Sequence, residues 1–238
     1  MDLELASAST KQIYNLLIGL VAPRPIAWIT SMDLAGKLNA APFSAYNYMG
    51  VDPPIVAVGI GNLPGPGVIG KDTAQNIRNT REFVINVVNE SVAEAMNVTA
   101  SDFPQAINEL DIVHLKTEPS LLVKVPRIAA APASLECREI TTMEIGRSRI
   151  VLGLVVAIHV KDEFIDKTGN AEFGGPYIHA DQLHAIGRMN GLGAYVKTKD
   201  AFFRIPRMTY DGWKQKNGTQ PQLPVGRECV TGQTGSMA

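Results

Sequence analysis

The sequence predicts a mainly β fold, a barrel or curled sheet of mostly antiparallel strands with a few peripheral helices. Short apolar runs rich in valine and isoleucine recur along the chain, separated by turn residues and with few long helical patterns between them. The regular alternation of strand and helix that builds a doubly wound parallel sheet is absent. With 238 residues, 45% of them hydrophobic, the chain is long enough for one domain with a full core.

The first elements are a helix and two strands around a tight turn. A helix over residues 10–19 carries apolar residues on one face, and an apolar, β-branched strand follows at 26–30. Residues 33–37 form a hairpin turn. The second strand, near 38–46, contains small and polar residues, and its Pro42 lacks an N–H, which places it at an edge, a bend or a bulge. These small residues leave room for a flat ligand, although an ordinary edge strand without a ligand would show the same sequence pattern.

The rest of the chain predicts more strands and a few short helices. Residues 99–119 form a mostly irregular excursion, and Gly153 marks a bend or bulge inside the longest strand. The predicted strands are 55–60, 82–88, 128–131, 133–142 and 149–160, and the predicted helices are 73–81, 90–97 and a single turn at 108–110.

A glycine-rich loop precedes the helix at 73–81. Residues 65–71 fit the first seven positions of a nucleotide-binding P-loop, but Asp72 stands where the magnesium-binding hydroxyl belongs, and a carboxylate there would repel phosphate. A simpler interpretation is that Lys71, the Thr73 hydroxyl and the amides at the start of the helix suit a phosphate group. The alternative is that Asp72 or Thr73 caps the helix beside a solvated lysine.

Composition and charge exclude several classes of partner. The net charge of −1 provides no basic field for nucleic acid or an anionic membrane. The longest apolar runs fall short of the roughly 18 residues that a membrane span needs, and the start of the chain lacks the basic region of a secretory signal. Cys137 and Cys229 form no CxxC pair and are typical of structural thiols in a reducing compartment. We therefore expect a cytoplasmic protein.

Metal and nucleophile motifs are missing from the sequence. The four histidines show neither an HExxH nor an HxH spacing, so no metal site is expected. No Gly-x-Ser-x-Gly elbow occurs, which gives a serine hydrolase little support.

Several spaced motifs together resemble one known family. They are Pro-Arg-Pro-Ile-Ala-Trp-Ile-Thr-Ser at 23–31, Asn-Ala-Ala-Pro-Phe-Ser at 39–44, Asp-Pro-Pro at 52–54 and Lys-Asp-Thr-x-x-Asn-Ile at 71–77. In this order they resemble the flavin reductase-like, FMN-binding split-barrel family. The resemblance implies a Greek-key split β-barrel, FMN held at a homodimer interface, and flavin reduction by NADH or NADPH.

The resemblance also implies site residues. Thr30 and Ser31 would lie against the ribityl chain or ring, the segment 39–44 would face the edge of the isoalloxazine, and Lys71 would hold the phosphate. The cofactor-binding residues implied in this way are Thr30, Ser31, Asn39, Ala40, Ala41, Pro42, Phe43, Ser44, Asn47, Lys71, Asp72, Thr73, Asn76 and Arg188.

For a few other residues, the resemblance implies a role less specifically. Arg24 and Trp28 belong to the motif, but a surface salt partner and a core aromatic are equally good roles for them. Arg147 or Arg149 would reach the phosphate from a neighbouring hairpin. No residue is assigned as a catalytic base, because the flavin carries the hydride chemistry. His159 and Arg188 are the candidates nearest to the nicotinamide or flavin, and a hydrogen-bonded core histidine and a surface arginine are their alternatives.

The expected function is an FMN-binding NAD(P)H:flavin oxidoreductase that transfers hydride from nicotinamide to flavin N5. The alternatives are an FMN protein for electron transfer or storage without turnover, and a P-loop nucleotide hydrolase. FAD in place of FMN, and NADH against NADPH, stay open. The expected partners are a second copy of the chain and a flavin-dependent monooxygenase or another electron acceptor. Residues 1–210 should form the domain, and the tail 211–238 should be loosely ordered or pack on the partner subunit.

Overall fold

The structure, a computed structural model, describes residues 2–62, 70–101, 103–104, 107–170, 175–191, 193–199 and 215. The chain forms two compact units, residues 1–202 and 203–238. The predicted tail, apart from residue 215, and the predicted domain boundary at residue 210 lie outside the described residues. So does most of the glycine-rich loop, residues 63–69, and so does Cys229.

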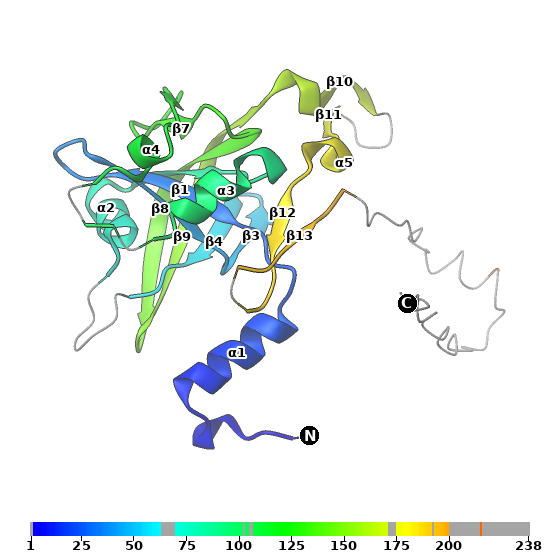
Figure 1. Ribbon diagram of the computed structural model, residues 1–238. Helices are drawn as coiled ribbons and strands as arrows, with labels where there is room; N and C mark the ends of the chain where they lie inside the picture. The colour runs from blue at the N-terminus through cyan, green and yellow to red at the C-terminus, as the bar shows by residue number, and fades with distance from the viewer. Residues whose placement is uncertain are drawn as a thin grey trace, which may run out of the picture. The chain divides into compact units, whose positions relative to one another are not determined.

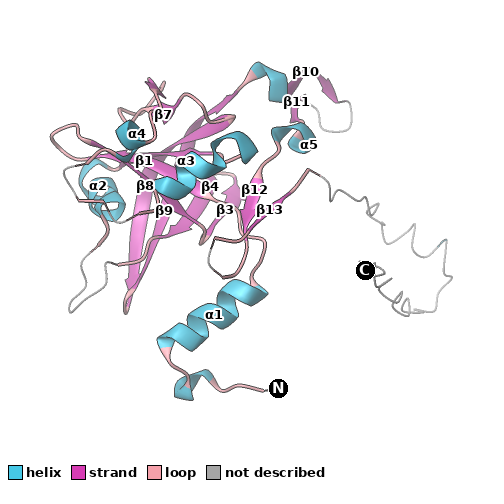
Figure 2. Cartoon of the chain, in the orientation of Figure 1, coloured by secondary structure: helices cyan, strands magenta, loops and turns pink. Residues whose placement is uncertain are grey.

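A seven-stranded antiparallel sheet dominates the first unit (Figures 1 and 2). The strand order is β2-β1-β5-β8-β9-β4-β3, and every neighbouring pair in it is antiparallel. This arrangement confirms the predicted mainly β fold and lacks the parallel strands on which a P-loop hydrolase is built. The strands are β1 (Ala27–Met32), β2 (Leu38–Phe43), β3 (Tyr46–Val51), β4 (Pro54–Gly59), β5 (Glu82–Asn86), β8 (Ala133–Ile145) and β9 (Ser148–Val160).

The two edges of this sheet are joined by two residues. Strand β2 lies at one edge and β3 at the other, yet only Ser44 and Ala45 separate them in sequence. The sheet must therefore curl until its edges approach, as in a barrel. The prediction of one strand near 38–46 was wrong, because the chain passes at Ser44 from one edge to the other. Pro42 lies in the edge strand β2, as its missing N–H predicted.

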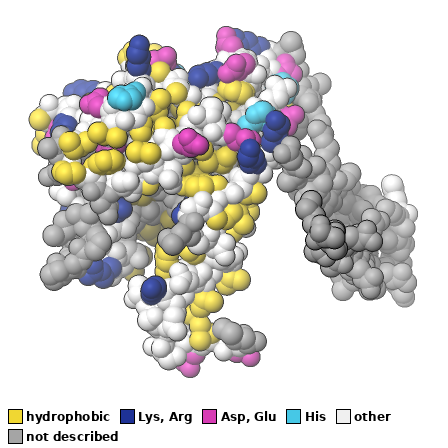
Figure 3. All heavy atoms as spheres, in the orientation of Figure 1, with side chains coloured by type: hydrophobic (Ala, Val, Ile, Leu, Met, Phe, Trp, Pro, Cys, Tyr) yellow, Lys and Arg dark blue, Asp and Glu magenta, His cyan; other side chains and the backbone are white. Residues whose placement is uncertain are grey.

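The helices are short and lie outside the sheet. Ser9 and Gln12 form a capping box that starts α1 (Thr10–Leu20), and Asn108 caps α4 (Glu109–Ile112). None of the residues of α1 is buried, and Figure 3 shows hydrophobic side chains exposed along this helix. No helix in the described ranges has the length and hydrophobicity to cross a membrane. The other α-helices are α2 (Asp72–Thr80), α3 (Ala93–Val98) and α5 (Ala180–Leu183), and 3₁₀ turns lie at Leu5–Ser7, Glu90–Val92 and Asp162–Phe164.

Three short hairpins complete the first unit. They pair β6 (Thr117–Glu118) with β7 (Arg127–Ile128), β10 (Ile165–Asn170) with β11 (Gly175–Ile178), and β12 (Ile186–Arg188) with β13 (Tyr195–Lys197).

Strand β1 is covered on both faces. On one face, Ala27 and Ile29 join a core cluster that Ala74 and Ile77 of α2 complete. On the other face, Trp28 joins a second cluster, to which α3 and α4 contribute. This double burial explains why residues 26–30 form an unbroken apolar run rather than an alternating one.

The predicted irregularity at Gly153 is confirmed. The register between β8 and β9 shifts beside Gly153, at Glu139 and Thr141 of the partner strand. A Cβ atom at this position would lie 2.5 Å from Cζ of Phe83, which is fully buried. Glycine is therefore required here by the close approach of the phenyl ring.

Candidate functional site

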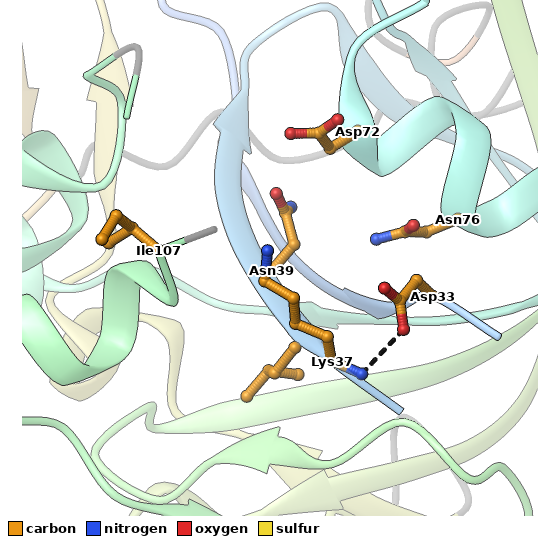
Figure 4. Close-up of a pocket in the computed structure, with 7 residues that line it drawn as sticks. Asp33, Lys37, Asn39, Asp72, Asn76 and Ile107 are labelled. Atoms are coloured by element: carbon orange, nitrogen blue, oxygen red, sulfur yellow. Dashed lines mark hydrogen bonds between the residues drawn. The ribbon is translucent and has the colours of Figure 1, made fainter. Parts of the chain in front are cut away.

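A polar cavity lies between the β1–β2 hairpin and the start of α2 (Figure 4). Its volume is about 390 Å³, within the usual range for small-molecule sites. Three of the predicted cofactor-binding residues line it, and Figure 4 shows their side chains converging from β2 and α2. The lining residues are Asp33, Lys37, Leu38, Asn39, Asp72, Asn76 and Ile107.

Two side-chain hydrogen bonds fix α2 against the strands beside this cavity. The Asn39 amide donates to the Thr73 hydroxyl at 2.9 Å, and the Asn76 amide donates to the Ser31 hydroxyl at 3.2 Å. Thr73 and Asn76 are buried and lie one helical turn apart on the same face of α2. The structure thus brings four predicted site residues together from three elements.

The outer edge of β2 presents backbone amides to this region. At the hairpin, the Asp33 amide donates to the Lys37 carbonyl, so Lys37 faces β1. Because facing and non-facing residues alternate along an antiparallel pair, the amides of Leu38 and Ala40 point away from β1. Leu38 lines the cavity, and its amide points outward along the same edge. The amide of Ala40 is already bound by a side chain.

That side chain is Glu109, which sequence reasoning missed. Its carboxylate accepts a 2.9 Å hydrogen bond from the Ala40 amide, and the residue is 9% exposed. Burial raises the pKa of Glu109, and the nearby Asp72 carboxylate adds to the effect, while the Ala40 amide and Lys37 oppose it. An acidic residue in a four-residue helix gives no signal of burial in the sequence, because such positions are usually solvated.

Acidic side chains outnumber basic ones among the described residues that line the cavity. Its lining carries the carboxylates of Asp33 and Asp72 against one ammonium, that of Lys37. Asp33 is engaged in the turn, where its carboxylate accepts from the amides of Ala35 and Lys37. Such a lining suits a neutral polar ring with donors and acceptors along its edge, and it disfavours a phosphate dianion.

Lys71 lies just outside the cavity, at the N-cap of α2. The Lys71 side chain makes no capping hydrogen bond, and the helix begins at Asp72, so neither Asp72 nor Thr73 occupies the N-cap position of the predicted alternative. The Thr73 hydroxyl instead accepts from Asn39. The positive end of a helix dipole beside a lysine suits an anionic group.

Thr30 and Ser31 point to opposite faces of β1. The Ser31 hydroxyl faces α2, where Asn76 donates to it. The Thr30 hydroxyl donates to the Pro126 carbonyl at 2.7 Å on the other face. Both residues are fully buried, and their side chains cannot meet one ligand on the same side of the strand.

The other predicted residues of the 39–47 segment are spread around the barrel. Phe43 is buried in the core cluster that contains α2, and Ala41 packs against that cluster. The Ser44 hydroxyl accepts from Arg24, and Asn47 is exposed on β3 at the opposite sheet edge. None of these side chains lines the cavity.

Arg24 is a buried residue that hydrogen-bonds to several segments, and it is not a surface salt partner. It is 9% exposed, and its guanidinium donates to the carbonyls of Ile18, Val21 and Met189 as well as to Ser44. It therefore joins the end of α1 to the link between the two sheet edges. Trp28 is a core aromatic with no exposed surface, and its indole N–H donates to Thr99.

Neither Arg188 nor Arg149 lines the cavity, but Arg149 lies beside Gly70, the residue before Lys71, where an added Cβ would overlap Nη1 of Arg149. Arg188 donates to the carbonyls of Ala194 and Gly191 and stacks 4.8 Å from the centre of the Tyr195 ring. Arg149 is bound by Glu144. Both guanidinium groups therefore already have protein partners.

His159 is held by a buried carboxylate. Its Nε2 lies 2.5 Å from the carboxylate of Glu136, which has no exposed surface and also accepts the amides of Leu121, Leu122 and Val123. Burial alone would raise the pKa of Glu136, but these hydrogen bonds together lower it. His159 belongs to a different part of the sheet from this cavity, and it lines a second pocket of about 380 Å³ together with Arg127 and Ser134.

Comparison with known proteins identifies the family. The flavin reductase like domain matches residues 20–182. An uncharacterized protein of Deinococcus radiodurans is 39% identical over 209 residues, which cover 85% of this chain and 88% of that protein. The protein YwrF of Bacillus subtilis is 36% identical over 203 residues, covering 83% and 94%.

Two solved structures share most of this chain's fold. The 2-nitrobenzoate 2-nitroreductase NbaA of Pseudomonas fluorescens is 34% identical, with a TM-score of 0.77, covering 88% of this chain and 98% of that one. Component B of the nitrilotriacetate monooxygenase of Bacillus cereus is 29% identical, with a TM-score of 0.77 and coverage of 86% and 98%. With its curled antiparallel sheet and a domain match over most of its length, the chain belongs to the flavin reductase-like family of split-barrel proteins.

Proposed function

We propose that this protein binds FMN and reduces it with NADH or NADPH. The observation that carries the proposal is the match of the flavin reductase like domain to residues 20–182. The related structures that are named as a nitroreductase and as a monooxygenase component support a flavin-dependent oxidoreductase. When bound, flavin supplies the hydride chemistry, and the protein supplies binding and orientation.

The cavity offers the groups that a flavin ring requires. Asn39 and Asn76 are donors for ring oxygens and nitrogens, and Asp72 is an acceptor for a ring N–H. We place the polar edge of the isoalloxazine here. Its phosphate would lie toward Lys71 at the N-cap of α2, where the ammonium and the positive end of the helix dipole act against the neighbouring Asp72 carboxylate. A phosphate grip of this kind favours FMN over FAD.

Partners follow from the same proposal. One related structure is named as component B of a monooxygenase, so a flavin-dependent oxygenase in the cytoplasm is our proposed consumer of the reduced flavin. A second candidate acceptor is a nitro-substituted benzoate, which the 34% identity to NbaA favours. We also propose a homodimer, whose second copy would cover part of the flavin.

The test is an absorption spectrum of the purified protein with FMN, followed by NADH and then NADPH without oxygen. We expect a bound flavin that bleaches on the timescale of turnover. Bound flavin that stays oxidised with both nucleotides would instead favour an electron-transfer or storage protein, and no binding of FMN would refute the proposal. Adding 2-nitrobenzoate to the reduced protein then tests the second candidate, through re-oxidation of the flavin.

A further inference from the structure

One wall of the cavity belongs to a segment that is far from β2 in sequence. Ile107 lines the cavity and stands two residues before Glu109, in the excursion that contains α4. The cavity therefore has its observed shape only while this segment stays against the edge of β2.

Glu109 makes a polar contact between the described part of this segment and the strand. Its carboxylate accepts the outward amide of Ala40, which lies between Asn39 and Ala41 and two residues from Leu38. Next to it, Leu110 is 1% exposed and packs in the cluster that contains Ala40 and Trp28. Apolar packing holds the segment near the sheet, and the directional hydrogen bond of Glu109 sets its register along β2.

We propose that Glu109 is a positioning residue of the flavin site. By binding the Ala40 amide, it fixes β2 and the Ile107 wall at the separation that the flavin ring requires. It also removes the Ala40 amide from the donors that a ligand could use at this edge. This role rests on the proposed function, because it concerns the site at which FMN would bind.

Two substitutions of Glu109 separate the effect of its hydrogen bond from the effect of its charge. Glu109→Gln keeps an acceptor oxygen for the Ala40 amide and removes the charge. Glu109→Leu removes the acceptor and leaves the amide without its partner. Asp111→Leu is the matched control, since Asp111 is an exposed carboxylate on the same short helix.

The experiment measures FMN dissociation constants and hydrogen exchange of the Ala40 amide in the full chain. We expect Glu109→Leu to weaken FMN binding at least tenfold and to expose the Ala40 amide to exchange. Glu109→Gln should stay within about threefold of the wild type, with the amide still protected, and Asp111→Leu should change neither quantity. Thermal unfolding of each variant checks that the folded state is populated during the measurements.

The outcomes distinguish this proposal from the proposed function. If the wild type binds FMN and Glu109→Leu binds it equally well, the positioning role is refuted and the function stands. If the wild type binds no FMN, the function fails, and the exchange of Ala40 still tests the tie between Glu109 and β2. Unchanged exchange in Glu109→Leu would refute that tie.

Discussion

The side-chain amide of Asn39 donates a 2.9 Å hydrogen bond to the hydroxyl of Thr73, and this bond joins the edge strand β2 to the first turn of α2. One turn further along the helix, Asn76 makes a similar bond to Ser31 of β1. Both bonds lie beside the cavity, so the position of α2 and the width of the site depend on them.

The Asn39–Thr73 bond should be measurable as a coupling energy. Asn39→Ala and Thr73→Val should each lower the free energy of unfolding by about 1–3 kcal/mol, because each leaves a partly buried polar group without its partner. The double variant should lose less than the sum of the two, with a coupling of about 1 kcal/mol. Urea unfolding of the wild type and the three variants gives this value. Strictly additive losses would mean that the bond does not stabilise the protein.

Lys71 should contribute to FMN affinity. Lys71→Ala should weaken FMN binding by about 1–3 kcal/mol, the scale of a charge-assisted hydrogen bond to phosphate. Fluorescence titration with FMN measures the effect. Lys124→Ala is the control, because Lys124 is exposed and lies outside the cavity lining. An unchanged dissociation constant for Lys71→Ala would remove this lysine from the site.

Glu136 should make stability depend on pH in the acid range. Its folded-state pKa is lowered from the ordinary value of 4.5, so the ionised carboxylate stabilises the fold above that value. This contribution is lost as the pH falls from about 5 through the lowered pKa. The difference in unfolding free energy between the wild type and Glu136→Gln should therefore be largest at pH 7 and shrink toward pH 3.

Glu163→Gln serves as the control for this pH series, since Glu163 is exposed. Its unfolding free energy should follow that of the wild type at every pH. A difference between the wild type and Glu136→Gln that stays constant from pH 7 to pH 3 would show that the ionisation of Glu136 does not contribute to stability.

Gly153 should not tolerate a side chain. In Gly153→Ala the new Cβ would lie 2.5 Å from the buried Phe83 ring, and relieving this overlap should cost about 1–3 kcal/mol of unfolding free energy. At Gly61, by contrast, a Cβ would meet no atom of the described residues within 4 Å. Thermal or urea unfolding should therefore show a loss for Gly153→Ala and little change for Gly61→Ala.

Local patterns in the sequence were sufficient to predict most strands. The apolar runs at 26–30, 55–60 and 82–88 correspond to β1, β4 and β5 within a few residues. The missing N–H of Pro42 indicated an edge, a bend or a bulge, and the first of these is what the structure shows. The break between β2 and β3 was missed, since Ser44 and Ala45 continue the run of small and polar residues without a turn signal.

The site was harder to predict because it depends on tertiary contacts. From the motifs we predicted Asn39, Asp72 and Asn76 as site residues, and these three do line one cavity. They also grouped Thr30 with Ser31, although neighbouring strand residues face opposite sides and here both sides are buried. Glu109 gave no signal, since its role depends on a contact with Ala40, 69 residues away in sequence.

The edge of β2 also has a bearing on strand addition by other molecules. An uncovered edge strand is a template on which the strand of another molecule can add, and such pairing leads to aggregation. Of the outward positions of β2, Pro42 has no N–H to offer, and the N–H of Ala40 is held by Glu109. A strand of another molecule could therefore not accept backbone hydrogen bonds from two adjacent outward positions of β2. In the folded protein, the hydrogen bond between Glu109 and Ala40 therefore also hinders strand addition at this edge.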